Sequence, residues 1–243
     1  MNKKLTAQLP RRRIYFILTH MIQLSQFIIM DVPADVQANC GDRSCMWMLH
    51  KPSGIDTDLA PGSDLHTILP EPVRSHRFHH VGRLDRDTSG LLLFSNDGDH
   101  TFTVLNSPSL EKTYLAQVAR APTPQQCQNL IDGVVLPDGL ASARSVSVLR
   151  EAECHPDEIR PLFLNARVRP IEKEHFFIRV TTRDGRYRVV RRMLAAVGLS
   201  VLSLHRESVG PISLPKHSIP GECVSLSSSS ITDLILSAKG SNS

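Results

Sequence analysis

The sequence predicts a single domain built from both strands and helices, and three observations support this. The chain has 243 residues, 41% of them hydrophobic, which is enough to enclose one sizeable core. Short apolar or alternating runs bounded by Gly and Pro are typical of strands. Longer amphipathic segments that begin at capping residues and end near Gly are typical of helices. We expect the domain at residues 45–226, between an N-terminal extension (1–44) and a Ser-rich C-terminal tail (227–243).

The first half of this domain is expected to contain three strands and one short helix. Cys45 to His50 is a short apolar run, and the Lys51-Pro52-Ser53-Gly54 segment ends it, because Pro lacks an amide proton and Gly permits a turn. A short helix is expected at residues 65–69. Two more strands, at 78–84 and 91–94, flank a charged loop that a glycine closes.

The second half mixes strands with two longer helices. Strands are expected at 112–119, 142–149 and 176–182, and helices at 122–131 and 190–197. Thr123 is the expected N-cap of the first helix, and Gly133 follows it. Residues 151–174 are charged, hold three prolines and show no periodicity, so we expect an insertion there. In the tail, the Ser230-x-x-Asp233 pattern is typical of a cap on a short final helix.

Positive charge is concentrated at the N-terminus. The whole chain carries +4, whereas residues 1–30 hold five Lys and Arg and no acidic residue, so the remainder carries 4 − 5 = −1. A uniformly cationic nucleic-acid binder is therefore excluded, and any surface that contacts nucleic acid must be a local patch.

The cysteines and the N-terminal segment bear on the cellular compartment of the protein. The five cysteines are scattered, and neither a Cys-x-x-Cys pair nor zinc-ligand spacing occurs, so we expect free thiols and no metal site. Polar residues interrupt the apolar stretch from Ile14 to Met30, which argues against a membrane span. The Arg-rich leader fits an import sequence or an ordinary helix equally well, so we expect a cytoplasmic protein, or a mitochondrial or plastid one if the leader directs import.

The segment from Arg83 to Gly90 is the strongest candidate for a functional site. It places two arginines, two aspartates, a Thr-Ser pair and a glycine between apolar strand ends. Clusters of this kind often hold an ionised carboxylate at a site of function. From composition alone, a salt-bridged turn explains the segment as well.

The order of the residues goes further than their composition. The segment from Gly82 to Gly98 resembles the signature of the RsuA and RluB/E/F branch of the pseudouridine synthases. Three more blocks follow the order of that family: Leu49 to Gly54, Glu111 to Tyr114, and Gly185 to Gly198 with its continuation to Gly210. The resemblance spans about residues 48–214. The residues before it show no match to the S4 RNA-binding domain that many relatives carry.

The resemblance implies an α+β fold with a long, mixed, mostly antiparallel sheet, flanking helices and a central catalytic cleft. It also implies an isomerase that converts a uridine of a structured RNA, ribosomal RNA by branch, into pseudouridine. No cofactor is implied because the isomerisation is redox-neutral. We expect a monomer that has neither DNA nor a membrane as a partner.

Three catalytic residues follow from the resemblance: Asp85 as the essential carboxylate, Tyr114 as the ring that stacks on the target base, and Arg191 as the partner of Asp85. The reaction must break the bond from N1 to C1′, turn the uracil while it stays bound, and rejoin it through C5. A carboxylate can attack C1′ or remove a sugar proton to give a glycal, and both mechanisms are open. The uridine must be flipped out of any helix to reach Asp85.

The expected RNA-binding side chains are Arg83, Lys112, Arg188 and Arg192. The last two belong to a group of five arginines in residues 183–192, which is the best local candidate for a phosphate-contacting patch. Lys112 is expected either to contact phosphate or to pair with an acid such as Glu111. If residues 190–197 are helical, Arg191 faces the pocket and Arg192 faces RNA or solvent.

The sequence departs from the family pattern at Tyr187 and Val189, where Asn and Gln are usual. This departure leaves the Asp85 and Arg191 pair intact but puts contacts to the base or the backbone in doubt. Two other functions compete with the isomerase. A non-catalytic RNA-binding or ribosome-assembly factor on the same fold is disfavoured by the intact catalytic residues. A carboxylate glycosidase is disfavoured because no second acid lies in a comparable motif.

Overall fold

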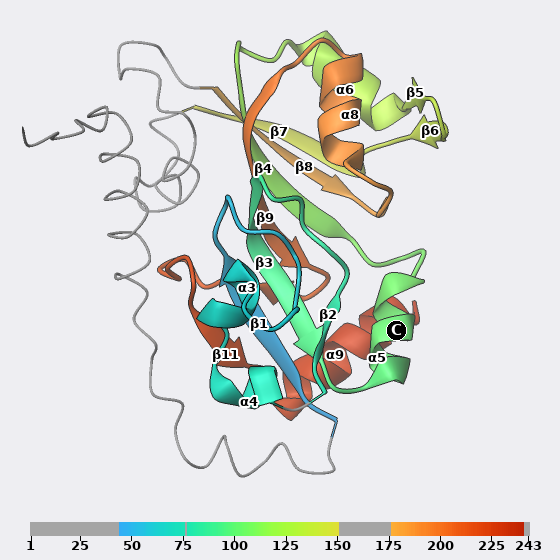
Figure 1. Cartoon of the computed structure of the whole chain (residues 1–243). Coiled ribbons are helices and arrows are strands. Elements are labelled where there is room, and N and C mark those ends of the chain that lie inside the picture. Colours follow the sequence, from blue (N-terminus) through green and yellow to red (C-terminus); the bar gives the residue numbers. More distant parts are fainter. Residues whose placement is uncertain (1–43, 76, 151–175, 241–243) are drawn as a thin grey trace, which may run out of the picture.

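The protein is described by a computed structural model that covers residues 44–75, 77–150 and 176–240. Apart from Ser44, the predicted N-terminal extension lies outside these ranges, and so does the predicted insertion at 151–174. The described part contains a nine-stranded sheet, a separate two-stranded hairpin and helices packed on the sheet (Figure 1). None of its helices combines the length and hydropathy of a membrane-spanning segment.

The elements are as follows. The large sheet consists of β1 (Met46–Lys51), β2 (His79–Val81), β3 (Thr88–Ser95), β4 (Lys112–Val118), β7 (Ser145–Arg150), β8 (Phe176–Thr182), β9 (Val201–Val209), β10 (Ile212–Ser213) and β11 (Cys223–Ser225). The hairpin consists of β5 (Val134–Leu136) and β6 (Gly139–Ala141). The helices are α3 (Asp64–Ile68), α4 (Glu71–Ser75), α5 (Gly98–Leu105), α6 (Pro124–Asp132), α8 (Val189–Ala196) and α9 (Ser228–Ala238).

The sheet is mixed and mostly antiparallel. Its strand order is β11-β1-β3-β9-β4-β8-β7, with β10 paired to β9 and β2 paired to β3. The β3–β9 pair is parallel, and every other pair of the described strands is antiparallel. The prediction of an α+β fold with a mixed, mostly antiparallel sheet is therefore confirmed.

Strand β3 is buried along its whole length because both of its faces are covered. Side chains alternate between the two faces of a strand. Leu92 and Phe94 pack in a cluster with β1, α3 and α4. Leu91 and Leu93 pack in a second cluster with α5 and α9. This explains why the strand appears in the sequence as an uninterrupted apolar run and not as an alternating one.

The sheet divides into two halves next to β3. One edge of β3 pairs with β1 along the strand, whereas the other edge pairs first with β9 at residues 88–90 and then with β2 at residues 93–95. Helices α6 and α8 belong to the half formed by β4, β8 and β7, and α3, α4, α5 and α9 belong to the half formed by β1 and β3 (Figure 1). The acidic loop between β2 and β3 lies where the halves meet.

Several predicted boundaries were wrong. The strand expected at 91–94 begins at Thr88, because Thr88 to Gly90 pair with β9, so the charged loop is shorter than expected. The strand expected at 78–84 is confined to the three residues of β2. Helices α4 and α5, the β5–β6 hairpin and strands β10 and β11 were not predicted, since short elements carry too few residues to show a periodicity. The nine-residue strand β9 was also missed, because its buried His205 and Arg206 interrupt the apolar pattern.

The predicted tail also needs correction, because part of it belongs to the domain. Helix α9 begins at Ser228, and the Ser227 hydroxyl caps it by accepting from the Ser230 amide at 3.1 Å. Ile231 and Leu234 are buried in the cluster that contains Leu91 and Leu93. The high serine content of the segment hid these apolar positions.

Candidate active site

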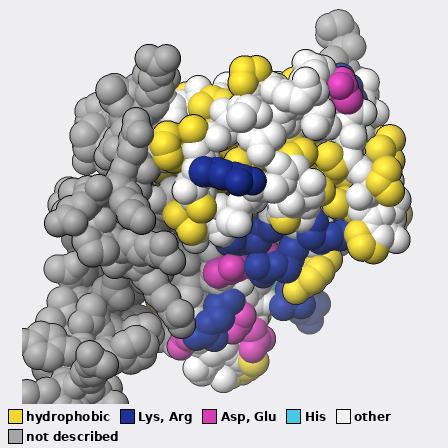
Figure 2. Space-filling model, turned by 90° about the horizontal axis from the view of Figure 1, so that it is seen from above, with side chains coloured by type: hydrophobic (Ala, Val, Ile, Leu, Met, Phe, Trp, Pro, Cys, Tyr) yellow, Lys and Arg dark blue, Asp and Glu magenta, His cyan; other side chains and the backbone are white. Residues whose placement is uncertain are grey.

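A cleft of about 680 Å³ opens at the junction of the two halves of the sheet. Its walls come from the loop between β2 and β3, from strands β4 and β9, and from the turn before α8. Basic and acidic side chains gather side by side on the face seen in Figure 2. The cleft-lining charged residues are Asp56, Arg83, Asp85, Arg86, Lys112, Asp184, Arg186, Arg188 and Arg206.

Asp85 lies between the two halves and faces two guanidinium groups of the other half. Its Oδ2 lies 3.3 Å from Arg188 Nη1 and 3.9 Å from Arg191 Nε. Arg191 does not itself line the cleft and is the more buried arginine. The predicted pair of Asp85 and Arg191 is thus brought together, and Arg188 is a closer second partner.

Asp87 holds both arginines in place. Arg188 donates to the two oxygens of the Asp87 carboxylate at 3.2 and 3.3 Å, and Arg191 Nη2 donates to the Asp87 carbonyl oxygen at 2.9 Å. Burial alone would raise the pKa of Asp87, but the hydrogen bonds from Arg188 and the charges of both arginines outweigh it and lower that pKa. Asp87 therefore positions the cations that Asp85 faces.

Lys51 fixes the backbone of the loop between β2 and β3, which carries Asp85. Its ammonium group is fully buried and donates to the carbonyl oxygens of Pro52 (2.9 Å), Asp85 (3.3 Å) and Thr88 (2.9 Å). Burial lowers its pKa to about 8. The sequence placed Lys51 at the end of a strand and in a block of the family resemblance, but gave its side chain no role. The structure shows that it ties the end of β1 to both sides of the loop that carries Asp85.

The turn before α8 adopts an unusual backbone conformation. Arg188 has φ of 49°, in the left-handed region that side-chain-bearing residues rarely adopt, and it occupies the N-cap position without capping by its side chain. Such a conformation costs on the order of 1 kcal/mol and persists where surrounding contacts fix it. It directs Arg188 toward Asp85, while the neighbouring Tyr187 is exposed at the cleft. Val189 is largely buried at the cleft wall, and its apolar side chain offers no polar contact.

Tyr114, Lys112 and Arg206 share one face of the sheet. Tyr114 lies directly opposite Arg206 in the β4–β9 register, and Lys112 is two residues before Tyr114 on β4. All three line the cleft. The sequence placed Arg206 in the last block of the family resemblance but gave it no role, because only the register of β4 against β9 places it beside Tyr114.

The patch of five arginines is internally neutralised. Arg183 pairs with Glu111, Arg186 with Asp184 and Asp138, and Arg188 and Arg191 with Asp85 and Asp87. We expected Arg192 to face RNA or solvent, but it pairs with Asp138 and donates to the carbonyl oxygen of Tyr187 at 3.0 Å.

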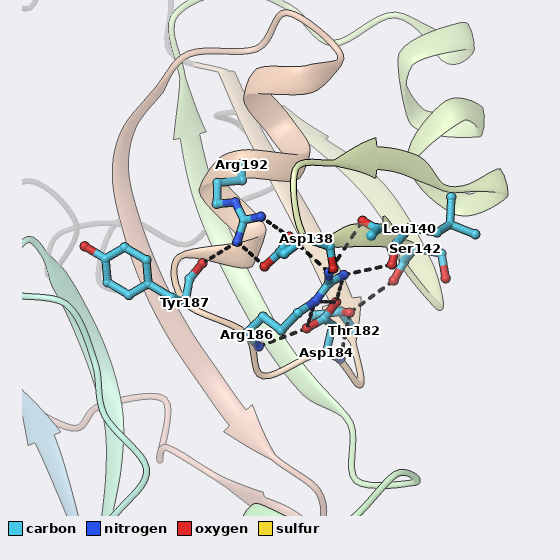
Figure 3. Close-up of polar contacts among 9 residues, drawn as sticks. Asp138, Leu140, Ser142, Thr182, Asp184, Arg186, Tyr187 and Arg192 are labelled. Carbon is cyan, nitrogen blue, oxygen red and sulfur yellow. Dashed lines mark hydrogen bonds and ion pairs between the residues drawn. The ribbon is translucent and has the colours of Figure 1, made fainter.

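Figure 3 shows how Arg186 and Arg192 join the turn before α8 to the β5–β6 hairpin. Arg186 donates to the carbonyl oxygens of Asp138 (2.7 Å) and Leu140 (2.8 Å), and the Tyr187 ring points away from this network. These arginines are therefore committed to contacts within the protein. Among the described residues, the cleft-lining basic side chains that have no ion pair are Arg83, Lys112 and Arg206.

The sequence profile of RNA pseudouridylate synthases matches residues 46–196, which is more than half of the chain. The chain belongs to the RNA pseudouridylate synthase family. The resemblance drawn from the motifs is thereby confirmed. The family match includes Asp85, Tyr114 and Arg191, whereas Arg206 lies beyond it.

Curated relatives and solved structures agree with this assignment to the RNA pseudouridylate synthase family. Ribosomal small subunit pseudouridine synthase A of Yersinia pestis is 34% identical over 180 residues, which are 72% of this chain and 66% of that protein. The Escherichia coli (strain K12) protein of the same name is 32% identical over 193 residues, or 78% and 73% of the two chains. A crystal structure of a pseudouridylate synthase superposes with a TM-score of 0.61 at 26% identity, covering 79% of this chain and 74% of that one.

Proposed function

We propose that this member of the RNA pseudouridylate synthase family isomerises a specific uridine of structured ribosomal RNA, with Asp85 as the catalytic carboxylate. The observation that carries the proposal is the position of Asp85, at the wall of the cleft with two guanidinium groups within 4 Å of one of its oxygens. Ribosomal RNA is proposed as the substrate because the names of the curated relatives refer to the ribosomal small subunit.

The arrangement suits chemistry at an anomeric carbon. Two cations face the Asp85 carboxylate and attract one of its oxygens, which favours the ionised form. That oxygen can form a bond to C1′ as the bond to N1 breaks, or it can remove a sugar proton to give a glycal, and the proposal includes both routes. No sugar hydroxyl leaves, so the reaction needs no second acid, which agrees with the structural contacts of Asp87.

The detached uracil must stay in the cleft while it turns. Tyr114 offers a ring on the cleft wall for the base to stack on, and the volume of about 680 Å³ falls within the range of small-molecule sites. Arg83 and Lys112 are the proposed RNA contacts. We propose that Arg188 pairs with Asp85 and contacts the substrate beside it. Arg192 instead supports the turn before α8 through its ion pair with Asp138.

The test compares Asp85→Asn with the wild type in cells that lack the native protein, with pseudouridines mapped across total RNA. We expect the wild type to restore at least one pseudouridine, and Asp85→Asn to restore none while the purified variant still binds RNA. Asp99→Asn, at an exposed aspartate of α5, is the matched control and should behave like the wild type. A pseudouridine restored by Asp85→Asn would overturn the proposal.

The same experiment separates the isomerase from the competing assembly factor. If the protein is a non-catalytic factor on this fold, cells with Asp85→Asn should grow normally and no pseudouridine should depend on the protein.

The monomeric state is a proposal that sedimentation of the purified chain would test. Because residues 1–43 lie outside the described ranges, the choice between cytoplasm and organelle also stays a proposal, and imaging of a fluorescent fusion would test it.

A further inference from the structure

Arg206 is a buried cation that lacks a counter-ion. Its side chain is only 4% exposed, and its Nε donates to the Leu91 carbonyl oxygen at 2.8 Å. Its Nη2 is buried and meets no acceptor among the described residues, and none of the described acids lies within ion-pair distance of it. A buried charge without a partner costs several kcal/mol, so such groups are normally paired.

Lys112 is a second unpaired cation on the same face. It makes no ion pair or hydrogen bond with its ammonium group in the described part of the chain, and it lines the cleft together with Arg206. Burial lowers the pKa of Lys112 and the nearby charge of Arg206 lowers it further, and the charge of Asp184 offsets only part of this effect. The two cations therefore repel each other, and the cleft between them is a position where an anion would be stabilised.

The other arginines of the cleft do not share this property. Arg86 pairs with Asp56 at 2.7 Å, Arg186 pairs with Asp184 at 2.6 Å, and Arg188 pairs with Asp85 and Asp87. Arg83 has no ion pair among the described residues but is exposed to solvent, where an unpaired charge costs little. Arg206 and Lys112 are thus the cleft-lining cations of the described chain that are both unpaired and at least partly shielded from solvent.

We propose that Arg206 and Lys112 form an anion subsite on the cleft wall, and that the site binds a phosphate of the uridine nucleotide that is flipped onto Tyr114. The register supports this ligand, because Arg206 lies directly across from Tyr114 and Lys112 lies two residues along the same strand. A base stacked on the ring of Tyr114 places its own phosphates next to both cations. The inference rests on the proposed function, since it assigns Tyr114 to the base.

The test compares the affinities of uridine and uridine 3′,5′-bisphosphate for the purified chain, measured by calorimetry or by NMR titration. The wild type should bind the bisphosphate on the order of tenfold more tightly, as expected for charge-assisted hydrogen bonds to phosphate. Arg206→Gln and Lys112→Gln should each remove most of that advantage and leave the affinity for uridine unchanged. Arg183→Gln is the matched control, because it removes one charge nearby that already pairs with Glu111, and it should keep the advantage.

The outcomes separate this inference from the proposed function. The subsite is overturned if both Arg206→Gln and Lys112→Gln still bind the bisphosphate more tightly than uridine. It is also overturned if Arg183→Gln loses as much of this preference as they do. If Arg206→Gln fails to fold because the bond to Leu91 is lost, Lys112→Gln decides alone. If the wild type forms pseudouridine but both variants still bind the bisphosphate more tightly than uridine, the anion subsite is refuted and the proposed function stands. If no pseudouridine depends on the wild type but both variants lose the tighter binding of the bisphosphate, the proposed function is refuted and the anion subsite stands.

Discussion

At the scale of single residues, the two arginines that face Asp85 differ in their surroundings. The Arg188 side chain is 32% exposed and lies 3.3 Å from the Asp85 oxygen, whereas the Arg191 side chain is 11% exposed and lies 3.9 Å from it. Screening by water weakens an exposed pair far more than a difference of 0.6 Å does. The Arg191 Nε is also buried without a hydrogen-bond acceptor among the described residues, so it is available to Asp85.

Loss of Arg191 should therefore impair catalysis more than loss of Arg188. We expect Arg191→Gln to lower the single-turnover rate by about 10- to 100-fold, which corresponds to the loss of a largely buried charge facing Asp85. Arg188→Gln should lower the single-turnover rate less than Arg191→Gln does, because water partly screens the charge of Arg188. Arg144→Gln, an exposed arginine outside the cleft, serves as control. Equal rates for Arg191→Gln and Arg144→Gln would contradict the assignment of Arg191.

At the scale of elements, the glycine that closes the acidic motif is explained by the packing of two strands. Gly90 has φ of 111°, and it pairs with Lys51 on one side and with Arg206 on the other. A Cβ atom at this position would lie 2.5 Å from the backbone nitrogen of Arg206 and closer still to its carbonyl oxygen. Any larger residue would push β3 and β9 apart at the point where they hold Asp85 and Arg206.

Gly90→Ala should consequently destabilise the fold by about 3 kcal/mol or more, through backbone strain and separation of the two strands. Gly54→Ala isolates the strain alone, since Gly54 also has a positive φ (91°) but a Cβ added there would meet no atom within 4 Å. We expect it to cost only about 1 kcal/mol. Urea unfolding of both variants measures the difference, and equal losses would show that the close approach of β9 is not responsible.

Helix α9 shows a second property of an element that the sequence concealed. Leu234 is fully buried against β3 and α5, although its segment is rich in serine like a tail. Leu234→Ala should lower the free energy of unfolding by about 2–5 kcal/mol, the usual range for a core leucine. Leu236→Ala, at a half-exposed position of the same helix, should cost under about 1 kcal/mol in the same unfolding experiment. Similar losses would mean that α9 is not anchored by Leu234.

Elements with local signals were predictable, and elements defined by distant partners were not. The helix α6 was located by Thr123 and Gly133, and the structure adds a reciprocal hydrogen bond between Thr123 and Gln126. Strand β8 was predicted with its observed bounds. The start of β3 was missed because pairing with β9 decides it. In the site, motif order gave roles to Asp85 and Arg191, whereas the position of Arg206 beside Tyr114 needed the strand register.

At the scale of the whole molecule, β9 joins the halves that carry the site. It pairs with β3 through residues 88–90 and with β4 along most of its length. Two buried histidines lie at this junction: His205 of β9 and His50 of β1, whose rings meet edge to face at 5.2 Å. The Nδ1 atom of His205 shares a hydrogen bond with the Ser89 hydroxyl at 2.9 Å. Protonation of either ring would place a charge inside the junction.

The stability of the molecule should therefore fall in mild acid. Burial lowers the pKa of His50 to about 4 and that of His205 to about 3, and both stay neutral in the folded state. The unfolded chain regains pKa values near 6.5 and takes up to two more protons as the pH falls below that value. Since the unfolded state binds the extra protons, these two histidines should lower the free energy of unfolding by up to about 2.7 kcal/mol per pH unit between pH 6.5 and 4.

Replacement of one histidine tests whether the junction is the source of this acid sensitivity. In His205→Gln, the amide can still bond to Ser89 but cannot titrate, so the slope of unfolding free energy against pH between 6.5 and 5 should fall by up to about 1.4 kcal/mol per pH unit, the contribution of one proton. His217→Gln changes an exposed histidine and should leave the slope unchanged. Urea unfolding at a series of pH values measures all three proteins. Because carboxylates titrate mainly below pH 5, an equal slope in His205→Gln would place the sensitivity elsewhere in the molecule.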